Sequence, residues 1–321
     1  MNSALIIAFQ AVVMFILLAV GYFLYKKSLL GDEATQQLSN IAITIINPIV
    51  IFNAYQTDFD PSLFRGLMYA LLLAFIAQMI LVGSAYIMVR PNHRSAEIER
   101  FALGYSNCAF MGIPLIEATF GSEGVFYLTA FITAFNVFMW THGVVLMGGS
   151  DGKIPARERA MATAKILISP AILSIVLGLV FFFTGVRLPS IIQQPLDYLG
   201  SMNTPLAMLV SGATIAKAGL LDGLKNKRIY FLQSFKLLIV PMLLAALYVP
   251  MELFGVSPIV VNTIILAAAA PTASSTIMFS YKFGRDAGYA SNHFAMSTVA
   301  GIVTMPLVLA FAQMLERLFI P

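Results

Sequence analysis

The stretch SNCAFMGIPLIEATFG, residues 106–121, decides how this chain folds. It is as apolar as a membrane-spanning segment, yet it contains Asn107, two glycines and Pro114. Proline removes a backbone donor and clashes with the preceding helical turn, so the stretch predicts an interrupted helix. An interruption at membrane depth needs partners for the freed backbone groups, because lipid offers none.

The composition of the chain points to a lipid bilayer. Of its 321 residues, 59% are hydrophobic and only 11% are charged, and the mean hydropathy is +0.87. This is too little polar surface for a water-soluble globule of this size. The first 27 residues have neither a basic leader nor a small-residue cleavage site, so we expect a spanning helix there rather than a removed signal peptide. The single cysteine, Cys108, excludes an internal disulfide.

Apolar runs of about 20 residues, the length that crosses the hydrocarbon core, predict an all-α integral membrane protein with ten spans. These are residues 2–25, 36–55, 65–89, 99–120, 123–148, 160–184, 194–217, 229–253, 257–281 and 287–319.

The basic residues predict the orientation of these spans. Fifteen of the 19 Lys and Arg residues lie in the connections after odd-numbered spans, three lie on the other side, and Lys236 lies inside the eighth span. The asymmetry predicts a multi-pass protein of the cell membrane (plasma or inner membrane) with cytoplasmic odd-numbered connections and both termini outside. The net charge of +4 is therefore a topology signal and gives no reason to expect nucleic acid.

The two halves of the chain resemble each other. A shift of 157 residues aligns Pro48 with Pro205 and Pro114 with Pro271, which is a rare coincidence at a proline usage of about 5%. Because each half holds five spans, the second half enters the membrane in the opposite orientation. The sequence thus predicts a 5+5 inverted repeat of residues 1–150 and 151–321.

Inverted repeats with interrupted helices in corresponding positions are typical of secondary transporters that bind substrate near the bilayer midplane. We therefore expect the fourth helix to break at Pro114 and the ninth at Pro271, around a polar cavity. The alternative is an ordinary kink at each proline, satisfied by a neighbouring helix.

These segments also resemble the auxin efflux carriers of plants and their bacterial relatives, among them malate and malonate permeases. The 106–121 stretch is similar to the N-x-x-x-M-G-I-P-L segment of that family. INPIVIFNAY (46–55), SGATIAKAG (211–219) and AAAAPTASS (267–275) with the following YKFG also look like it. The resemblance covers essentially the whole chain.

The resemblance implies a scaffold domain from spans 1, 2, 6 and 7, often dimeric, and a transport domain from spans 3–5 and 8–10. It further implies that helices 4 and 9 cross at their breaks and bind a carboxylate there, with Asn107 in the position of the substrate-binding Asn. The same fold resembles the bile acid:sodium symporters. A homodimer through the scaffold is implied by the resemblance alone.

Neutral donors can hold an anion at such a crossing. A broken helix presents unpaired N–H groups with a partial positive charge, and an Asn amide can donate to a carboxylate. The candidate substrate-binding residues lie at a predicted break or at the paired Asn-Pro segments: Ser106, Asn107, Pro114, Pro271, Thr272, Ser274, Ser275, Asn47 and Asn203. The alternative is interhelical hydrogen bonding, worth about 0.6 kcal/mol per bond in membrane helices.

Ionisable side chains inside the spans are candidates for coupling or anion attraction, because burying them in a membrane is costly. Lys236 lies about two turns from the cytoplasmic end of its span, so we expect it to snorkel, with anion attraction as the alternative. His142 and His293 could carry protons or simply be hydrogen-bonded. Glu117 could act as a gate residue or be a solvated carboxylate at the outer mouth.

The chain has no Walker A sequence, no His/Cys metal cluster and no nucleophile elbow, so we expect neither an enzyme nor a cofactor or metal. The scarcity of carboxylates near the crossing argues against sodium coupling. The sequence predicts a secondary transporter of small organic anions of the malate or malonate type, working by alternating access. The alternatives are an auxin-like aromatic or other monocarboxylate, or a sodium-coupled organic anion of the bile-acid type.

Overall fold

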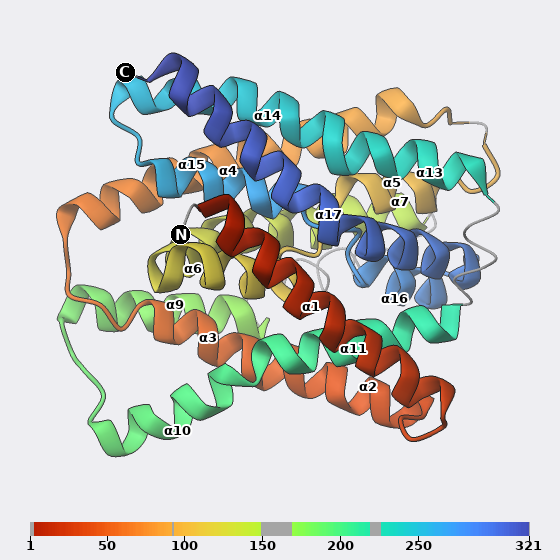
Figure 1. The fold of residues 1–321 in the computed structure, drawn as a ribbon, viewed down its shortest axis with the longest axis horizontal. Coiled ribbons are helices and arrows are strands. Elements are labelled where there is room, and N and C mark those ends of the chain that lie inside the picture. The colour runs from red at the N-terminus through yellow and green to blue at the C-terminus, as the bar shows by residue number, and fades with distance from the viewer. Residues whose placement is uncertain (1–2, 92, 149–168, 219–225, 321) are drawn as a thin grey trace.

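The computed structural model describes residues 3–91, 93–148, 169–218 and 226–320, and every regular element in these ranges is helical (Figure 1). Five helical runs are long and apolar enough to cross a membrane: Asp32–Ala54, Pro61–Met88, Cys108–Gly148, Lys227–Phe254 and Ala287–Phe319. Shorter apolar helices cover Val12–Lys26, Pro170–Thr184 and Pro258–Ala269. The chain is therefore a multi-pass helical membrane protein.

The first part of the chain contains α1 (Ser3–Lys26), α2 (Asp32–Ile41), η1 (Ala42–Ile46), α3 (Asn47–Ala54) and α4 (Pro61–Met88). The π-helical segment η1 joins α2 to α3 without a gap, and Pro48 lies in the first turn of α3, where its missing N–H costs little. Asp60 caps α4: its carboxylate accepts a hydrogen bond from Ser62 N at 2.7 Å, and this bond lowers the pKa of Asp60.

The next part contains α5 (Ala96–Gly104), η2 (Cys108–Gly112), α6 (Ile113–Phe138), η3 (Met139–Gly143) and α7 (Val144–Gly148). The run from η2 to α7 is not one straight helix. Gly121 has φ 65° and ψ −157°, a backbone conformation that glycine adopts readily and other residues rarely do. It divides α6 into two helical parts. The division agrees with the predicted boundary between the spans 99–120 and 123–148.

The last part begins after a region outside the described residues, which includes the start of the predicted span 160–184. It contains α9 (Pro170–Thr184), α10 (Ser190–Ser201), α11 (Asn203–Ala218), α13 (Lys227–Ser234), η4 (Phe235–Ile239), α14 (Val240–Tyr248), η5 (Val249–Phe254), α15 (Pro258–Ala269), α16 (Ser275–Lys282) and α17 (Ala287–Phe319). The segments α13, η4, α14 and η5 follow one another without a gap and form one long helical run.

Helices α1 and α11 pack at backbone distance (Figure 1). A Cβ on Gly21 would overlap the backbone of Leu209, and a Cβ on Gly212 would overlap the carbonyl of Leu18. Each helix therefore presents a glycine to the backbone of the other, which is how membrane helices approach most closely.

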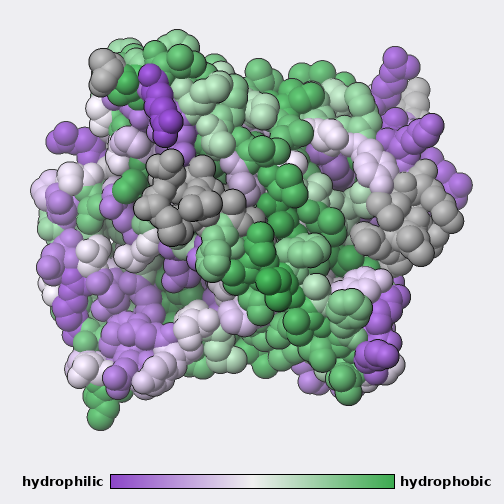
Figure 2. Space-filling view, viewed as in Figure 1, coloured by the Kyte–Doolittle hydropathy of each residue, from purple (hydrophilic) through white to green (hydrophobic). Residues whose placement is uncertain are grey.

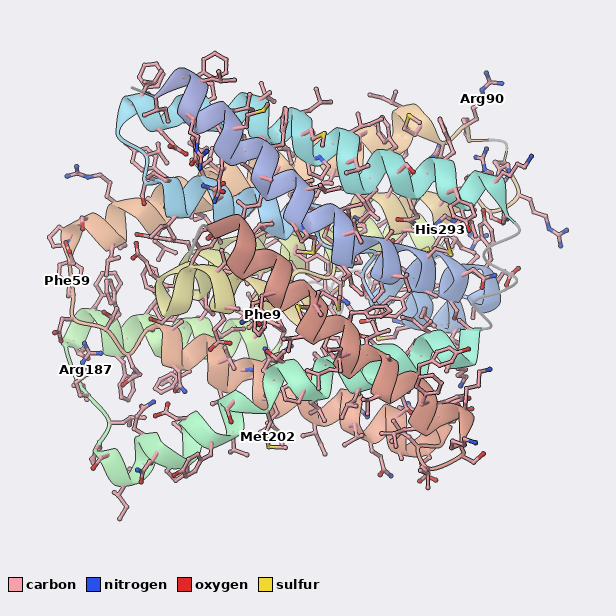
Figure 3. The ribbon with its side chains drawn as sticks, in the orientation of Figure 1. Phe9, Phe59, Arg90, Arg187, Met202 and His293 are labelled. Carbon is pink, nitrogen blue, oxygen red and sulfur yellow. The ribbon has the colours of Figure 1, made fainter. Side chains whose placement is uncertain are left out.

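The face of the molecule seen in Figure 2 carries polar ends and an apolar middle. Figure 2 shows hydrophobic residues across the centre of this face and hydrophilic residues gathered toward its left and right ends. Arg90 and Arg187 lie at opposite ends of the molecule (Figure 3). Large apolar side chains such as Leu72, Val176 and Leu243 are exposed on the helices. This distribution suits a bilayer whose plane is perpendicular to the long axis of Figure 1.

Candidate substrate site at the crossing of two helix breaks

Two helix breaks meet in the interior of the molecule. The first lies between α5, which ends at Gly104, and η2, which begins at Cys108; the second lies between α15, which ends at Ala269, and α16, which begins at Ser275. Each break leaves backbone groups without intrahelical partners, and in a membrane these groups need others.

The two breaks supply each other with hydrogen bonds. Ser106 and Thr272 form an isolated antiparallel β-bridge, and Asn107 N donates to Pro271 O at 2.7 Å. The Ser106 hydroxyl donates to Ala268 O at 2.9 Å. The segments are therefore crossed extended strands of a few residues, held by backbone bonds between helices more than 160 residues apart in sequence.

The predicted position of the first break was wrong. Pro114 is buried in the first turn of α6, and the break lies at residues 105–107. The amides of Met111 and Gly112 both donate to Asn107 O, so wide π-helical turns precede the proline and let it enter the helix without a lost bond. Pro271, in contrast, lies within its break as predicted.

The carbonyl end of α5 is fully satisfied by side chains and backbone from three other spans. The carbonyls of the last turn have at least one donor each, and these donors come from α4, from η4 and from the second break. In chain order, Ala102 O, Leu103 O, Gly104 O and Tyr105 O accept from Thr272 Oγ1, Lys236 Nζ, Gln78 Nε2 and Ala273 N at 3.0, 3.1, 2.8 and 3.0 Å.

Lys236 points into the crossing, so the predicted snorkelling was wrong. Its side chain is 1% exposed. The ammonium donates to Ser106 Oγ at 3.0 Å, to Leu103 O at 3.1 Å and to Tyr105 O at 3.4 Å. The broken helix places oxygen acceptors within reach of the amine inside the protein, which removes the reason to extend toward the membrane surface.

On the other side of the breaks, polar side chains are buried without a partner among the described residues. These are the amide nitrogen of Asn107 and the hydroxyls of Ser275 and Thr276. Asn107 precedes η2, and Ser274 precedes α16 without a side-chain capping bond. A buried polar group without a partner is costly, so each of them is available to a ligand.

Asn47 and Asn203, the two other predicted site asparagines, each lie at the start of a helix. Each is the first residue of its helix, α3 or α11, and each is buried. Asn47 Oδ1 and both amide atoms of Asn203 have no partner among the described residues.

The two predicted histidines are both hydrogen-bonded. His293 is buried on α17, and its Nδ1 lies 2.8 Å from Nε2 of Gln233, which also donates to Thr272 Oγ1 at 3.2 Å. His142 bridges the hydroxyls of Tyr105 and Tyr86 at 2.8 and 2.9 Å. His293 is thus one side chain away from the second break, through Gln233.

Glu117 lines a cavity of about 480 Å³ bounded by α3, α6, α10 and the connection before α10. Its polar wall includes Asn53, Gln193 and Asp197, which hydrogen-bond one another: Gln193 Nε2 donates to Asp197 Oδ1 at 2.7 Å, and Asn53 Nδ2 donates to the same oxygen at 3.1 Å. Arg187, also on the wall, pairs with Asp58 at 2.6 Å.

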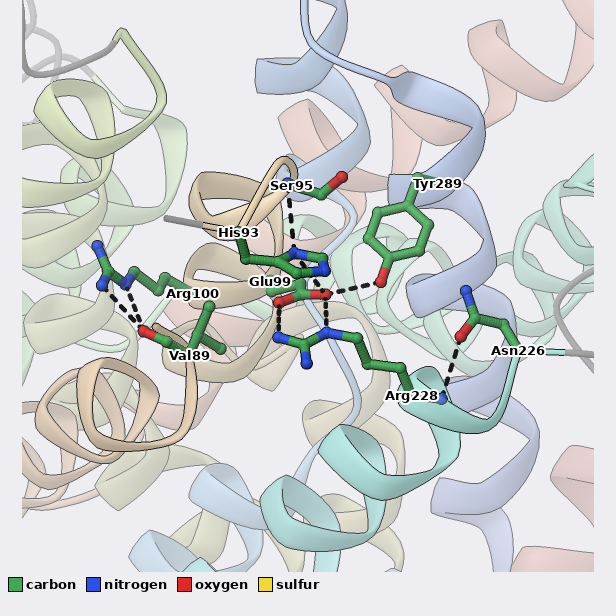
Figure 4. A network of polar contacts seen from close by, with 8 residues as sticks. All are labelled: Val89, His93, Ser95, Glu99, Arg100, Asn226, Arg228 and Tyr289. Carbon is green, nitrogen blue, oxygen red and sulfur yellow. Dashed lines mark hydrogen bonds and ion pairs between the residues drawn. The ribbon is translucent and has the colours of Figure 1, made fainter. Parts of the chain in front are cut away.

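A buried ionic cluster ties α5 to α13 and α17 (Figure 4). Glu99 is fully buried, and its carboxylate accepts from Arg228 Nε at 2.6 Å, Arg228 Nη2 at 2.7 Å and Tyr289 OH at 2.8 Å. His93 Nδ1 lies 3.5 Å from the same carboxylate. The cluster holds the starts of three helices together, and its bidentate geometry is the strong form of an Arg–carboxylate pair.

Sequence reasoning overlooked Gln78, Gln233, Thr276 and Ser297, although polar residues inside apolar spans were a usable signal for the first two. Ser297 on α17 accepts from Thr272 N at 3.0 Å and completes the second break.

The fold and the crossing define a multi-pass membrane protein with a polar site in its interior. A sequence profile of the family described as "Membrane transport protein" matches residues 6–309, and the chain belongs to this family. The match confirms the resemblance to the auxin efflux carriers.

Three relatives are similar along nearly their whole length. An "Uncharacterized transporter" of Methanothermobacter thermautotrophicus is 24% identical over 91% of this chain and 94% of its own. A "Putative malonate transporter" of Rhizobium meliloti is 24% identical over 90% of each chain. The "Uncharacterized transporter MJ1031" of Methanocaldococcus jannaschii is 22% identical over 92% of this chain and 95% of its own.

Proposed function

We propose that the chain is a secondary carrier of small organic anions of the malate or malonate type, which bind at the crossing of the two helix breaks. The observation that carries the proposal is the set of buried donors of Asn107, Ser275 and Thr276 at the starts of η2 and α16, which have no partner among the described residues. Helix N-termini carry partial positive charge, and an anion completes both the hydrogen bonds and the electrostatics.

A dicarboxylate is favoured over a monocarboxylate by Lys236. A single carboxylate is served by the neutral donors, whereas a second one needs a cation within reach. The Lys236 ammonium is 3.0 Å from Ser106 Oγ, on the break next to Asn107. The name of the Rhizobium meliloti relative supports malonate as the first substrate to test. An auxin-like aromatic or other monocarboxylate is the second candidate, and a sodium-coupled anion is the third.

The proposed architecture is ten spans in a 5+5 inverted repeat, and matched lengths support it. Helix α4 and the run from α13 to η5 both contain 28 residues and begin 166 residues apart, at Pro61 and Lys227. The bridged Ser106 and Thr272 are also 166 residues apart. Pro48 and Pro205 are 157 apart, so nine extra residues fall between Pro205 and Lys227. The structural counterpart of Pro271 is then Tyr105 rather than Pro114.

In this proposal α1, α2–α3, α9 and α10–α11 form the scaffold, and the remaining helices form the transport domain. The cavity that Glu117 lines takes its walls from α3 and α10 on one side and from α6 on the other. It would therefore open and close as the domains move, which is the requirement for alternating access. The proposed orientation in the cell membrane has both termini outside, and the proposed dimer uses the scaffold.

The experiment is a thermal-shift screen of the purified protein against malonate, malate, lactate and indole-3-acetate, with sodium or choline as counter-ion. A ligand of the folded state raises the melting temperature as RT ln(1 + [L]/Kd). We expect a sodium-independent rise with a dicarboxylate. In Asn107→Ala the apparent affinity falls about 10- to 150-fold, because a hydrogen bond to a charged group is worth about 1.5–3 kcal/mol.

The matched control is Asn136→Ala, which removes a buried Asn whose amide donates to Ile132 O of its own helix at 2.8 Å. It is expected to bind the dicarboxylate as the wild type does. An unchanged dissociation constant in Asn107→Ala, or equal losses in both variants, would contradict the assignment. Uptake of labelled malonate into liposomes then separates a carrier, which saturates, from a pore.

A further inference from the structure

The surroundings of the Lys236 ammonium differ from those of an ordinary buried lysine. Its three acceptors, Leu103 O, Tyr105 O and Ser106 Oγ, are all uncharged oxygens, at 3.0 to 3.4 Å. Buried lysines are as a rule paired with an acidic group, because an unpaired charge is costly to desolvate. Here the compensation comes from the carbonyl end of α5, which carries partial negative charge.

These oxygens are the ligands that a small monovalent cation uses. Carbonyl oxygens replace the hydration shell of alkali cations in selective pores. In transporters with broken helices, the carbonyl ends of half-helices coordinate the coupling cation. The last turn of α5 is such an end, and an ammonium with three N–H donors matches three oxygens.

We propose that Leu103 O, Tyr105 O and Ser106 Oγ form a monovalent-cation site and that Lys236 fills it as a covalently tethered cation. The site is intrinsic to the crossing, so removal of the amine opens it to a free cation. The inference rests on the proposed function in one respect only. If the protein is a sodium-independent carrier, the tethered ammonium explains why no sodium is needed. The binding property itself is independent of whatever substrate is carried.

The position of Lys236 on η4 supports its assignment as a cation tethered at the first break. The preceding turn carries Gln233, which reaches the second break through Thr272 Oγ1 at 3.2 Å. Lys236, three residues later, reaches the first break. One face of the eighth span therefore serves both breaks, and it supplies a neutral donor to one and a charge to the other.

The experiment uses Lys236→Ala, which removes four heavy atoms and leaves the three oxygens in place. Melting temperatures are measured on the full-length protein in detergent extract, in 100 mM choline, sodium or methylammonium chloride, without organic anion. A site with a dissociation constant of about 10 mM gives a rise of about 3 °C at this concentration. We expect that rise with methylammonium, and a smaller one with sodium, relative to choline.

Wild type and Lys282→Ala are the controls. Lys282 is exposed at the end of α16, so its loss opens no internal site. For each of these two proteins, the melting temperature is expected to be the same in all three salts. A folded Lys236→Ala that does not distinguish the salts would overturn the proposal, as would an equal response of wild type.

Lys236→Gln provides a second test in case Lys236→Ala does not fold. The amide of the introduced Gln keeps a donor near the carbonyls. The Gln side chain is one bond shorter than that of Lys, and this difference leaves space for sodium but not for methylammonium. We expect a sodium-specific rise in melting temperature, and its absence would overturn the proposal. Failure of malonate to shift the wild type, with a cation response in Lys236→Ala, would instead refute the proposed substrate and leave the cation site standing.

Discussion

Gly301 is one of the residues through which α17 contacts the second break, and its replacement tests how tightly the crossing is packed. A Cβ on Gly301 would lie 2.6 Å from Cγ and 3.3 Å from Cδ of Pro271. Carbon atoms in contact lie about 3.5–4.0 Å apart, so Gly301→Ala forces α17 and the break apart by about 1 Å. A proline ring can respond only by a change of pucker, because it has no freely rotating side chain.

The expected loss follows from two opposed terms. Overpacking costs about 1–3 kcal/mol, and alanine regains about 1 kcal/mol over glycine within a helix. The net loss is up to about 2 kcal/mol, which lowers the melting temperature by about 4 °C in a chain of this size. Scanning fluorimetry of the purified protein measures this shift, and malonate uptake into liposomes reports whether the displaced break still carries substrate.

Gly83→Ala is the matched control, because it adds the same methyl group to a helical glycine that has nothing within 4 Å. It is expected to melt at or above the wild-type temperature. The reasoning fails if Gly301→Ala melts at or above wild type while Gly83→Ala behaves as expected, because the close approach to Pro271 would then carry no cost.

Three further substitutions test how much individual buried and exposed contacts contribute to the stability of the protein. Glu99→Gln deprives Arg228 of a fully buried carboxylate. The free energy of unfolding, measured by thermal unfolding, should fall by about 2 kcal/mol. This is less than the roughly 3–5 kcal/mol lost when a wholly buried pair is broken, because the guanidinium is 39% exposed. Arg187→Ala removes an ion pair whose Asp58 partner is 96% exposed and should leave the melting temperature within about 2 °C of wild type, since such pairs contribute under about 1 kcal/mol. Gly212→Ala drives a methyl group into the backbone of α1, so the yield of monodisperse protein in size-exclusion chromatography should fall below that of Gly301→Ala.

The sequence was sufficient to predict a helical membrane protein and to locate one of the two breaks. Pro271 follows a run of alanines and ends α15 in a way that local rules describe. The break predicted at Pro114 was wrong because a proline is tolerated in the first turn of a helix. The position of Pro114 in such a turn follows from η2, which directly precedes α6. The true break, at residues 105–107, contains no proline at all.

Lys236 could not be placed from the sequence, because its surroundings come from residues about 130 positions earlier. Distance from the membrane surface along the chain favours snorkelling, whereas the direction of the side chain depends on which face of η4 meets α5. The Glu99 cluster was overlooked for the same reason, since Arg228 and Tyr289 lie 129 and 190 residues away. Tertiary contacts of this range decide whether a charge is buried.

The two sides of the crossing differ in a way that assigns opposite roles to them. At the end of α5 the carbonyls have donors, including the Lys236 ammonium. At the starts of η2 and α16 the donors of Asn107, Ser275 and Thr276 have no acceptor among the described residues. Helix dipoles place negative charge on the first side and positive charge on the second. A cation therefore belongs with the carbonyls, where the chain supplies its own, and an anion belongs with the unpaired donors, where it must come from solution.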